Sequence, residues 1–324
     1  MNKITLIAGF LCTPMHAFSQ GPGYAVSFHQ IFDNREYFSD YGFPQTIFGA
    51  RLNNSLLFEL DTMHSFAAGF SYLYEHGSTI AAVPPQVNLY YSYSAPELNM
   101  AFGAFPRNGR LDLPRRFLND TLNYYRPNVE GAWISFAREP IELSGFIDWT
   151  GRVTEERRER FLAGLDSKFS AGGFFLQGTF LMYHNARSYS DDDVVPLQDN
   201  GIFSVIAGYA RESVAFPFTM ETSAGYLSSY NRYRPGDFSI GRGVMYNIDL
   251  RYTIFGLDGV YYFGTPIVFE YGDPFYRSGN YGRLDLFADP FSHPRIESRL
   301  GWSFHLLPGE GIHHSQQLLI NVTF

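Results

Sequence analysis

Alternation of apolar and polar residues constrains the fold of this chain more than any other feature of its sequence. In 46–60, Phe48 and Leu52 share one side of an extended chain, whereas Arg51 and Asn53 share the other. Because successive side chains of a β-strand point to opposite faces, this pattern predicts a strand with one apolar and one polar face. The same alternation returns in 65–76, 244–252, 296–305 and 318–324. The fold class is therefore all-β.

The composition excludes several other classes of protein. Charged residues make up 17% of the chain and aromatic residues 18%, which is too little charge and too much aromatic surface for an ordinary soluble domain. No run of about 18 apolar residues follows the N-terminal segment, so a helical membrane protein is ruled out. The abundant aromatic residues exclude a disordered chain, and the net charge of -8 disfavours binding to nucleic acid.

The first residues predict export. A basic residue precedes the apolar run 4–12, and the small-x-small pattern at 17–19 suits cleavage by signal peptidase. We therefore expect 1–19 to be a removed signal peptide and 20–324 to form a single domain. The only cysteine, Cys12, lies in the predicted signal, so the mature chain would contain none.

The connections between predicted strands alternate between short and long. The short ones are near 61–64, 94–97, 138–140, 170–173, 211–216, 253–254 and 289–294. The long ones lie at about 33–45, 76–86, 106–128, 152–159, 185–199, 229–242 and 264–280, with a shorter last one near 307–313. Charged residues occupy the middle of the polar faces, and Tyr, Trp and Phe end the apolar faces. This combination is typical of a transmembrane barrel with an aqueous lumen and aromatic girdles.

The chain ends in an alternating stretch with an aromatic residue at the terminal carboxylate. Its apolar members are Leu318, Ile320, Val322 and Phe324. With the export signal and the alternating strands, the chain resembles porin-like bacterial outer-membrane β-barrel proteins over 20–324, and its last residues look like the signal read by the barrel-assembly machinery. The resemblance implies a location in the bacterial outer membrane, contact with its lipid and glycolipid, and assembly by that machinery.

We expect about sixteen antiparallel strands, with short periplasmic turns and longer extracellular loops. Their predicted ranges are 24–32, 46–60, 65–75, 87–93, 98–105, 129–137, 141–150, 160–169, 174–184, 201–210, 217–228, 243–252, 255–263, 281–288, 296–306 and 314–324. Fourteen strands is the alternative, because 98–105 and 281–288 are short enough to be loop. A barrel of about sixteen strands encloses an aqueous channel.

That geometry makes passive diffusion of small hydrophilic solutes the expected function. General porins narrow their channel with an infolded third extracellular loop, and here the third loop, 106–128, is also the longest. It lacks their acidic Pro-Glu-Phe-Gly-Gly stretch, so this similarity rests on position and length. The candidate constriction residues are Arg107, Arg110, Arg115, Arg116, Arg126, Asp112 and Asp120. The arginines could favour anions, contact a ligand, or pair with wall carboxylates such as Glu59, Glu75 and Asp148 and pin the loop.

The polar faces of the strands supply the residues expected to line the lumen. These are Arg51, Glu59, Glu75, Asp249, Arg251, Arg283, Asp285, Glu297, Arg299 and His305. Nearly all positive charge is carried by arginine, since the only lysines are Lys3 and Lys168. Arginines of the outer loops could grip phosphates of the outer-leaflet glycolipid, or simply pair with neighbouring glutamates.

An outer-membrane enzyme acting on lipid or surface polymer, of the phospholipase or deacylase kind, is the alternative function. Such enzymes place Ser and His on the lipid-facing wall or at the outer rim, whereas the lipid-facing positions here are almost entirely apolar in the sequence pattern. Ser303 and His305 share one inner face, but lumen-lining polar residues explain them more simply. The stretches 190–193 and 313–315 are weaker candidates. No motif predicts a metal, a cofactor or a phosphate loop.

Overall fold

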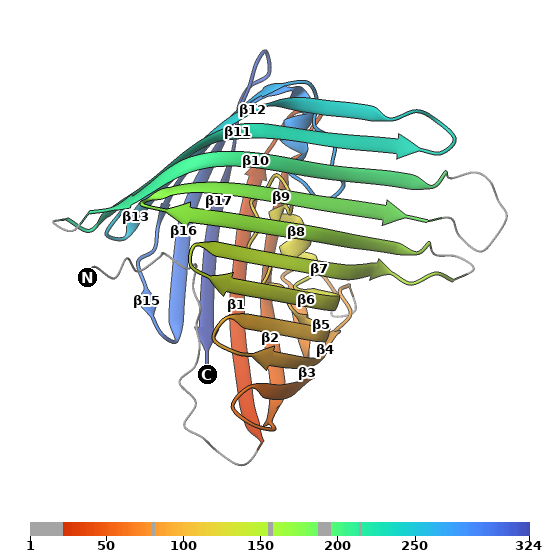
Figure 1. The fold of residues 1–324 in the computed structure, drawn as a ribbon, viewed down its shortest axis with the longest axis vertical. Helices are drawn as coiled ribbons and strands as arrows, with labels where there is room; N and C mark the ends of the chain where they lie inside the picture. The colour runs from red at the N-terminus through yellow and green to blue at the C-terminus, as the bar shows by residue number, and fades with distance from the viewer. Residues whose placement is uncertain (1–21, 80–81, 155–157, 187–195, 214–215) are drawn as a thin grey trace.

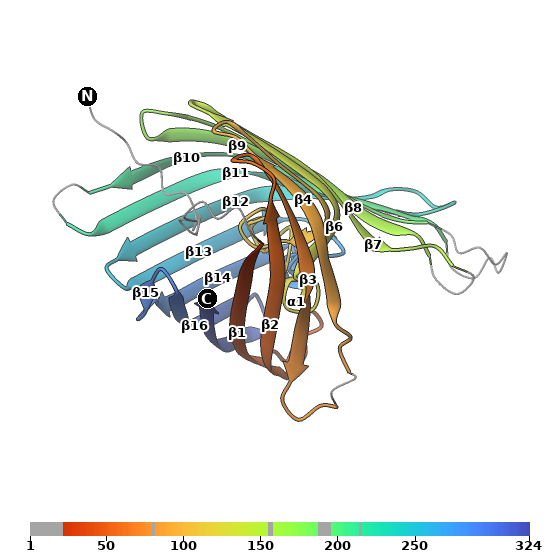
Figure 2. The same cartoon turned by 90° about the horizontal axis from the view of Figure 1, so that it is seen from below.

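The computed structural model is a closed ring of antiparallel strands (Figures 1 and 2). The ring closes because β1 (Gly23–Glu36) pairs with both β2 (Gln45–Glu59) and β17 (Gly311–Thr323). The structure describes residues 22–79, 82–154, 158–186, 196–213 and 216–324. The predicted signal peptide and the acidic stretch 190–193 lie outside the described residues. Within them, no helix is long and apolar enough to cross a membrane.

The other strands follow one another around the ring in chain order. They are β3 (His64–Glu75), β4 (Gln86–Ser94), β5 (Leu98–Pro106), β6 (Asn128–Arg138), β7 (Ile141–Gly151), β8 (Arg160–Ala171), β9 (Phe174–Asn185), β10 (Gln198–Glu212), β11 (Phe218–Tyr233), β12 (Ser239–Tyr252), β13 (Phe255–Gly264), β14 (Asn280–Ala288), β15 (Ser292–His293) and β16 (Ile296–Leu307). Seventeen strands are described, and without the two-residue β15 sixteen form the wall. The predicted sixteen-strand barrel is confirmed. The fourteen-strand alternative is wrong, because β5 and β14 pair with both neighbours.

The alternation in the sequence correctly assigns the two faces of the wall. In β2 the side chains of Phe48 and Leu52 are 44% and 41% exposed on the outer face, whereas Arg51 is 4% exposed on the inner face. Residues that are paired between neighbouring strands point to the same face of the wall. Arg51 pairs with His29 on β1 and with Leu73 on β3, so these three side chains all face the lumen. The outer face is therefore apolar around most of the ring.

Several strands, β1 and β11 among them, extend further at their extracellular ends than the apolar pattern predicts. β1 continues to Glu36 and β11 to Tyr233, beyond the predicted ends at 32 and 228. Backbone hydrogen bonds of a hairpin need no apolar side chains, so the ladder persists through the polar residues at the ends of these strands.

Two extracellular loops fold into the lumen. The third loop, 107–127, carries α1 (Asp120–Tyr125), which begins where Asn119 Oδ1 accepts from the N–H of Leu122 at 2.9 Å. The second infolded loop, 265–279, carries the 3-10 helix η1 (Pro274–Ser278). Figure 2 shows α1 enclosed by the ring of strands. The two loops contact each other, because the N–H of Asn119 donates to the carbonyl of Tyr271 at 2.8 Å.

Apolar side chains fill the lumen where the two loops meet. Phe117 and Leu118 of the third loop are 0% and 2% exposed. They belong to one core with residues of the second infolded loop and with inward-facing wall residues. The wall contribution includes Leu162, Leu181, Ile202, Leu227 and Met245. At this level the lumen is a packed core and not the aqueous channel that the strand count predicts, because loop side chains occupy the space that sixteen strands enclose.

Candidate functional site

A buried ion pair holds the base of the third loop. Arg107 Nη2 lies 2.5 Å from Asp148 Oδ2 on β7, and the two side chains are 2% and 0% exposed. The same guanidinium donates to the carbonyl oxygens of Arg126 and Asn128 across the neck of the loop, both at 3.3 Å. One arginine therefore ties both ends of the loop to the wall.

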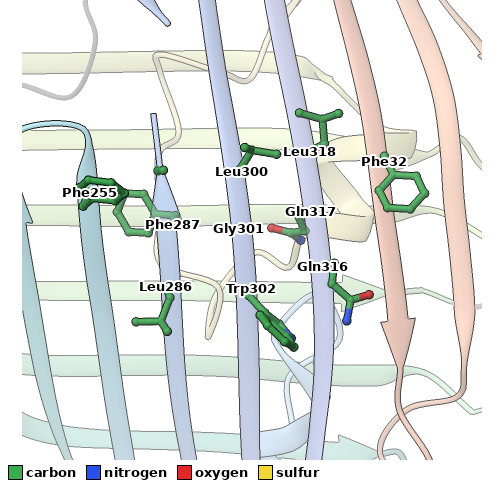
Figure 3. Close-up of a pocket in the computed structure, with 11 residues that line it drawn as sticks. Phe32, Phe255, Leu286, Phe287, Leu300, Gly301, Trp302, Gln316, Gln317 and Leu318 are labelled. Atoms are coloured by element: carbon green, nitrogen blue, oxygen red, sulfur yellow. The ribbon is translucent and has the colours of Figure 1, made fainter. Parts of the chain in front are cut away.

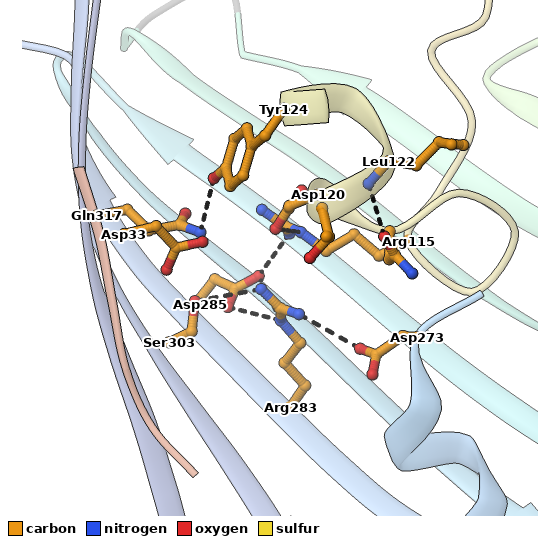
Figure 4. Close-up of polar contacts among 12 residues, drawn as sticks. Asp33, Arg115, Asp120, Leu122, Tyr124, Asp273, Arg283, Asp285, Ser303 and Gln317 are labelled. Carbon is orange, nitrogen blue, oxygen red and sulfur yellow. Dashed lines mark hydrogen bonds and ion pairs between the residues drawn. The ribbon is translucent and has the colours of Figure 1, made fainter. Parts of the chain in front are cut away.

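A cluster of ionised side chains joins both infolded loops to the wall (Figure 4). Arg115 contacts Asp120 of its own loop at 2.8 Å and Asp285 of β14 at 3.0 Å. Arg283 of β14 contacts Asp285 at 2.8 Å and Asp273 of the second infolded loop at 3.4 Å. Burial raises the pKa of Asp120, but Arg115 and Arg283 overcome that effect and hold its pKa below the usual value. Asp120 therefore stays ionised and keeps its pairing.

α1 is tied to the first strand by a second set of contacts. Arg35 donates to Asp33 Oδ2 at 2.8 Å and to Thr121 Oγ1 at 2.8 Å. Gln317 of β17 donates to the hydroxyl of Tyr124 at 3.4 Å. Arg51 donates to the carbonyl oxygen of Tyr124. The helix is thus bound to β1, β2 and β17, where the ring closes.

The other predicted constriction residues lie in mixed surroundings. Arg110 faces the rings of Tyr90, Phe105 and Trp133 at 5.5 to 6.0 Å. Arg116 is 6% exposed beside the ring of Phe117. Arg126 donates to the backbone carbonyls of Thr150 and Trp149, and Asp112 accepts from the N–H of Gly109. An effect of these residues on ion passage stays a prediction.

The residues predicted to line the lumen all lie on the inner face by strand register. These are Arg51, Glu59, Glu75, Asp249, Arg251, Arg283, Asp285, Glu297, Arg299 and His305. Several have partners within the lumen. Arg251 contacts Asp249 at 2.6 Å, Arg299 contacts Asp289 at 2.7 Å, and Glu75 accepts from the hydroxyl of Tyr125 at 2.5 Å. Contact with a solute stays a prediction.

Ser303 and His305 share the inner face, yet the structure joins each of them to a different partner. Arg283 donates to Ser303 Oγ at 3.2 Å. His305 Nδ1 lies 2.7 Å from the hydroxyl of Tyr281, and its ring packs on Phe275 at 4.3 Å between centroids. At 1% exposure His305 is sealed beneath the second infolded loop. This arrangement does not make a nucleophile and its base.

A hydrogen-bonded polar cluster lies on the outer, membrane-facing side of β1, β2 and β17. Asn34 Nδ2 donates to Gln316 Oε1 at 2.7 Å and to Glu36 Oε1 at 3.3 Å, and Asn34 Oδ1 accepts from Thr46 Oγ1 at 2.8 Å. Gln316 Nε2 donates to His314 Nδ1 at 2.8 Å. We call these five residues the outer cluster. They are an exception to the expectation that lipid-facing positions are almost entirely apolar, which holds around most of the ring.

An apolar groove of about 560 Å³ adjoins the outer cluster (Figure 3). Its outer-face walls are Phe32, Phe255, Leu286, Leu300, Trp302 and Leu318. Gln316 lines one end of the groove and also belongs to the outer cluster. Trp302 stands beside His314, with 6.0 Å between ring centroids. Polar and apolar parts therefore form one continuous site on the wall.

Sequence reasoning named His314, within the weaker candidate 313–315, but missed the outer cluster as a whole because its members come from the two ends of the chain. Asn34 and Gln316 are 282 residues apart and meet only where β1 pairs with β17. A signal was nevertheless present. Asn34, Glu36, His314 and Gln316 continue the lipid-facing alternation of their strands but are polar. Their shared break in the apolar pattern, at the extracellular end of the first and last strands, could have identified them.

Comparison with known proteins assigns the family. The model of the lipid A 3'-O-deacylase-type family matches residues 24–296. The chain belongs to this family. No curated protein matches the sequence.

Solved outer-membrane barrels share the fold of this deacylase-type chain. A loop-deletion mutant of the outer membrane protein OmpT of Vibrio cholerae has a TM-score of 0.58 at 9% identity, covering 94% of this chain and 99% of its own. An anion-selective porin from Comamonas acidovorans has a TM-score of 0.57 at 9% identity, covering 94% and 100%. A mutant of the Rh. blastica porin has a TM-score of 0.51 at 12% identity, covering 94% and 100%. The protein therefore has the fold of these outer-membrane barrels.

Proposed function

We propose that this protein is an outer-membrane hydrolase that removes an ester-linked acyl chain from a glycolipid of the lipid A class. The observation that carries the proposal is the outer cluster, a hydrogen-bonded group of polar side chains on the membrane-facing wall that continues into an apolar groove. Membership of the lipid A 3'-O-deacylase-type family supports it independently.

Polar and ionisable side chains are uncommon on the lipid face of a barrel, so a hydrogen-bonded group of them on this face is a candidate functional site. Glu36 ends β1 and His314 lies near the start of β17, which places both at the extracellular end of the wall. An acyl ester sits between a polar head group and apolar chains. A site with polar groups towards the head groups and a groove towards the chains matches that distribution of polarity.

The groove orients a chain and contributes little to affinity. An acyl chain that moves from the bilayer into the groove leaves one apolar surrounding for another, so there is no hydrophobic gain comparable to that of leaving water. The groove instead fixes which part of the lipid lies beside Glu36 and His314. Positioning of this kind is itself a large contribution to a reaction rate.

The outer cluster contains the proton-transfer groups that ester hydrolysis requires. Glu36 and His314 are direct partners in the β1–β17 register, and both side chains face outward. The Glu36 carboxylate takes a proton from water, whose oxygen adds to the ester carbonyl carbon. The bond between that carbon and the alkoxy oxygen then breaks. The alkoxy oxygen takes up the proton that Glu36 accepted, which regenerates the carboxylate, so ester and water give a free fatty acid and a hydroxyl group.

The hydrogen bonds inside the cluster set the roles of its members. An amide nitrogen only donates, so His314 Nδ1 accepts from Gln316 and the neutral imidazole carries its proton on Nε2. That N–H is available to a substrate oxygen. Asn34 holds the Glu36 carboxylate and Gln316 together, so it positions both groups without being required for proton transfer.

Mass spectrometry of lipid A provides the test. The wild-type protein, expressed in a Gram-negative host without lipid A deacylase activity of its own, should yield lipid A lighter by one acyl chain. Glu36→Gln and His314→Ala should each lower the deacylated fraction by about 100-fold or more, the usual effect of removing a proton-transfer group. Both proteins should still assemble.

His64→Ala is the matched control. His64 lies on the outer face at the periplasmic start of β3, away from the extracellular end where the outer cluster lies, and its ring is 2.6 Å from the Tyr91 hydroxyl. This variant should deacylate like wild type. Unchanged lipid A in cells containing assembled wild-type protein, or full activity in Glu36→Gln, would refute the proposal.

A narrow channel is the second candidate function. A polar cavity of about 170 Å³ lies between the third loop and the wall, lined in part by Arg110, Asp112, Ser144 and Asp166. The fold shared with porins favours testing this candidate. Single-channel recording in planar bilayers should give small steps if this cavity is part of a continuous path past the loops, and no steps if the packed core closes the lumen.

A further inference from the structure

Three side chains on the inner face form a hydrogen-bonded chain where β1, β2 and β17 meet. Ser27 Oγ lies 3.0 Å from His29 Nε2, and His29 Nδ1 lies 2.7 Å from Asn321 Oδ1. Ser27 and His29 are two positions apart on β1 and therefore share one face. Asn321 is the cross-strand partner of His29 on β17.

The donors and acceptors in this chain are fixed by chemistry. Asn321 Oδ1 only accepts, so His29 Nδ1 carries the proton and Nε2 holds a free electron pair. Ser27 O–H therefore donates to Nε2. A hydroxyl that donates to an imidazole held in its correct tautomer by a third group is the arrangement of a nucleophile, its base and a positioning residue.

We propose that Ser27, His29 and Asn321 form a second hydrolytic site, which opens to the periplasmic side and acts on small water-soluble carboxylic esters. Ser27 lies four positions from the periplasmic start of β1 and pairs with Thr323 close to the end of β17. Ser27 and His29 are partly exposed, whereas Arg51, the cross-strand partner of His29 on β2, is 4% exposed and donates to the carbonyl of Tyr124 in α1. Because α1 of the third loop is bound at Arg51, the loop restricts the space beside His29, and we expect only small molecules to be substrates.

The surroundings of Ser27 supply positive charge and a donor for the oxygen that becomes negative in the reaction. Asn53 Nδ2 donates to Ser27 Oγ at 2.9 Å. Arg51, the cross-strand partner of His29 on β2, donates to Ser71 Oγ at 2.8 Å and to the carbonyl of Tyr124, which are both neutral acceptors. A cation opposite His29 and an amide donor on Ser27 are groups that can stabilise negative charge developing on a substrate.

The wall separates this site from the lipid site. Ser27 and His29 face the lumen in the periplasmic half of β1, whereas Asn34 and Glu36 face lipid at its extracellular end. A glycolipid in the outer leaflet has no route through a closed ring of hydrogen-bonded strands. The two sites therefore act on different substrates, and each can fail its test without affecting the other.

The reaction proceeds through an acyl-serine intermediate. His29 Nε2 takes the Ser27 hydroxyl proton as Oγ bonds to the ester carbonyl carbon, and the alkoxy group leaves with that proton as an alcohol. Water then gives a proton to His29 Nε2 while its oxygen bonds to the acyl carbon. The bond to Ser27 Oγ breaks, Oγ recovers the proton, and a carboxylic acid is released.

A fluorophosphonate probe tests the site directly on the full-length protein in detergent. The probe should form a bond between phosphorus and Ser27 Oγ with loss of fluoride, and peptide mass spectrometry should find the label on Ser27. Ser27→Ala should not be labelled, and His29→Gln should be labelled about 100- to 10,000-fold more slowly because the general base is lost. Hydrolysis of p-nitrophenyl acetate should fall in parallel.

Asn321→Asp tests the positioning role. It should retain labelling, and the acid limb of its pH profile should move to higher pH, because a carboxylate stabilises the protonated imidazole. Ser55→Ala is the matched control, since Ser55 lies on the inner face of β2 and accepts from Asn88. It should be labelled like wild type, as should Glu36→Gln. An unlabelled wild-type protein, labelling at another residue only, or an unchanged rate in His29→Gln would overturn the proposal.

Discussion

Replacement of Arg107 by alanine should destabilise the protein strongly, because this change leaves a carboxylate buried without its cation. Asp148 is 0% exposed, and after the substitution its remaining described hydrogen bond is the one from the N–H of Glu130 at 2.9 Å. The neck of the third loop also loses the two bonds from Arg107 to backbone carbonyls.

The magnitude follows from burial. Removing one partner of a buried ion pair costs about 3–5 kcal/mol, which corresponds to about a 150- to 5,000-fold change in the unfolding equilibrium. An exposed pair offers the matched control. Arg138 and Glu97 are 3.6 Å apart with side chains 70% and 50% exposed, so Arg138→Ala should cost about 0–1 kcal/mol. The two substitutions should therefore differ by several kcal/mol.

Urea-induced unfolding in lipid vesicles, followed by tryptophan fluorescence and by loss of the heat-modifiable band on gels, measures the free energy of unfolding. A double variant, Arg107→Met with Asp148→Leu, removes both charges at once. It should recover most of the lost stability, because replacing a buried pair with apolar residues is often neutral. Limited proteolysis should cut the third loop faster in Arg107→Ala than in the double variant.

Two outcomes would refute this reasoning. If Arg107→Ala lost no more stability than Arg138→Ala, the buried pair would contribute no more than an exposed one. If the double variant were no more stable than Arg107→Ala, the loss would come from the backbone contacts of the neck and not from an uncompensated carboxylate.

Three further predictions concern the groove, the third loop and the lumen. Leu318→Trp should partly fill the groove, so that chain-length analysis of the released fatty acids shifts towards shorter chains. Burial raises the pKa of Asp112, although its carboxylate accepts from the N–H of Gly109. The folded loop therefore favours the protonated carboxyl group, and this contribution to stability is present in acid and is lost as the pH rises through the raised pKa. Asp112→Asn should accordingly slow proteolysis of the third loop at neutral pH and have little effect near pH 3, below the ordinary pKa of about 3.9. If the lumen conducts, Arg115→Ala with Arg116→Ala should move the reversal potential towards cation preference, more so at low salt, because fixed charges act strongly in a narrow passage.

Each of these has a result that contradicts it. An unchanged fatty-acid profile in an active Leu318→Trp protein would remove the groove from substrate positioning. Faster proteolysis of Asp112→Asn at neutral pH would mean that the carboxylate stabilises the loop when ionised. A reversal potential that does not move in a conducting Arg115→Ala, Arg116→Ala double variant would exclude these arginines from the ion path.

The sequence by itself determined the wall of this protein. Alternation is a local property, and it assigned Phe48 to the lipid and Arg51 to the lumen without knowledge of which strands are neighbours. The number of strands followed from the same pattern, interrupted by turns. The packed lumen had a weaker local signal. Inward-facing Leu162, Leu181 and Ile202 break the expected polar inner face, and only the infolded loops explain why they are apolar.

The tertiary structure alone decided where the candidate sites lie. Asn34 meets Gln316 and His29 meets Asn321 across separations of 282 and 292 residues. Those meetings depend on closure of the ring between the first and last strands, and on the register of that pairing. A period of two specifies the face of each residue but not its height on the neighbouring strand, since a shift of two residues keeps every face and changes every partner. Only the folded ring fixes that height, and with it which polar groups can act together.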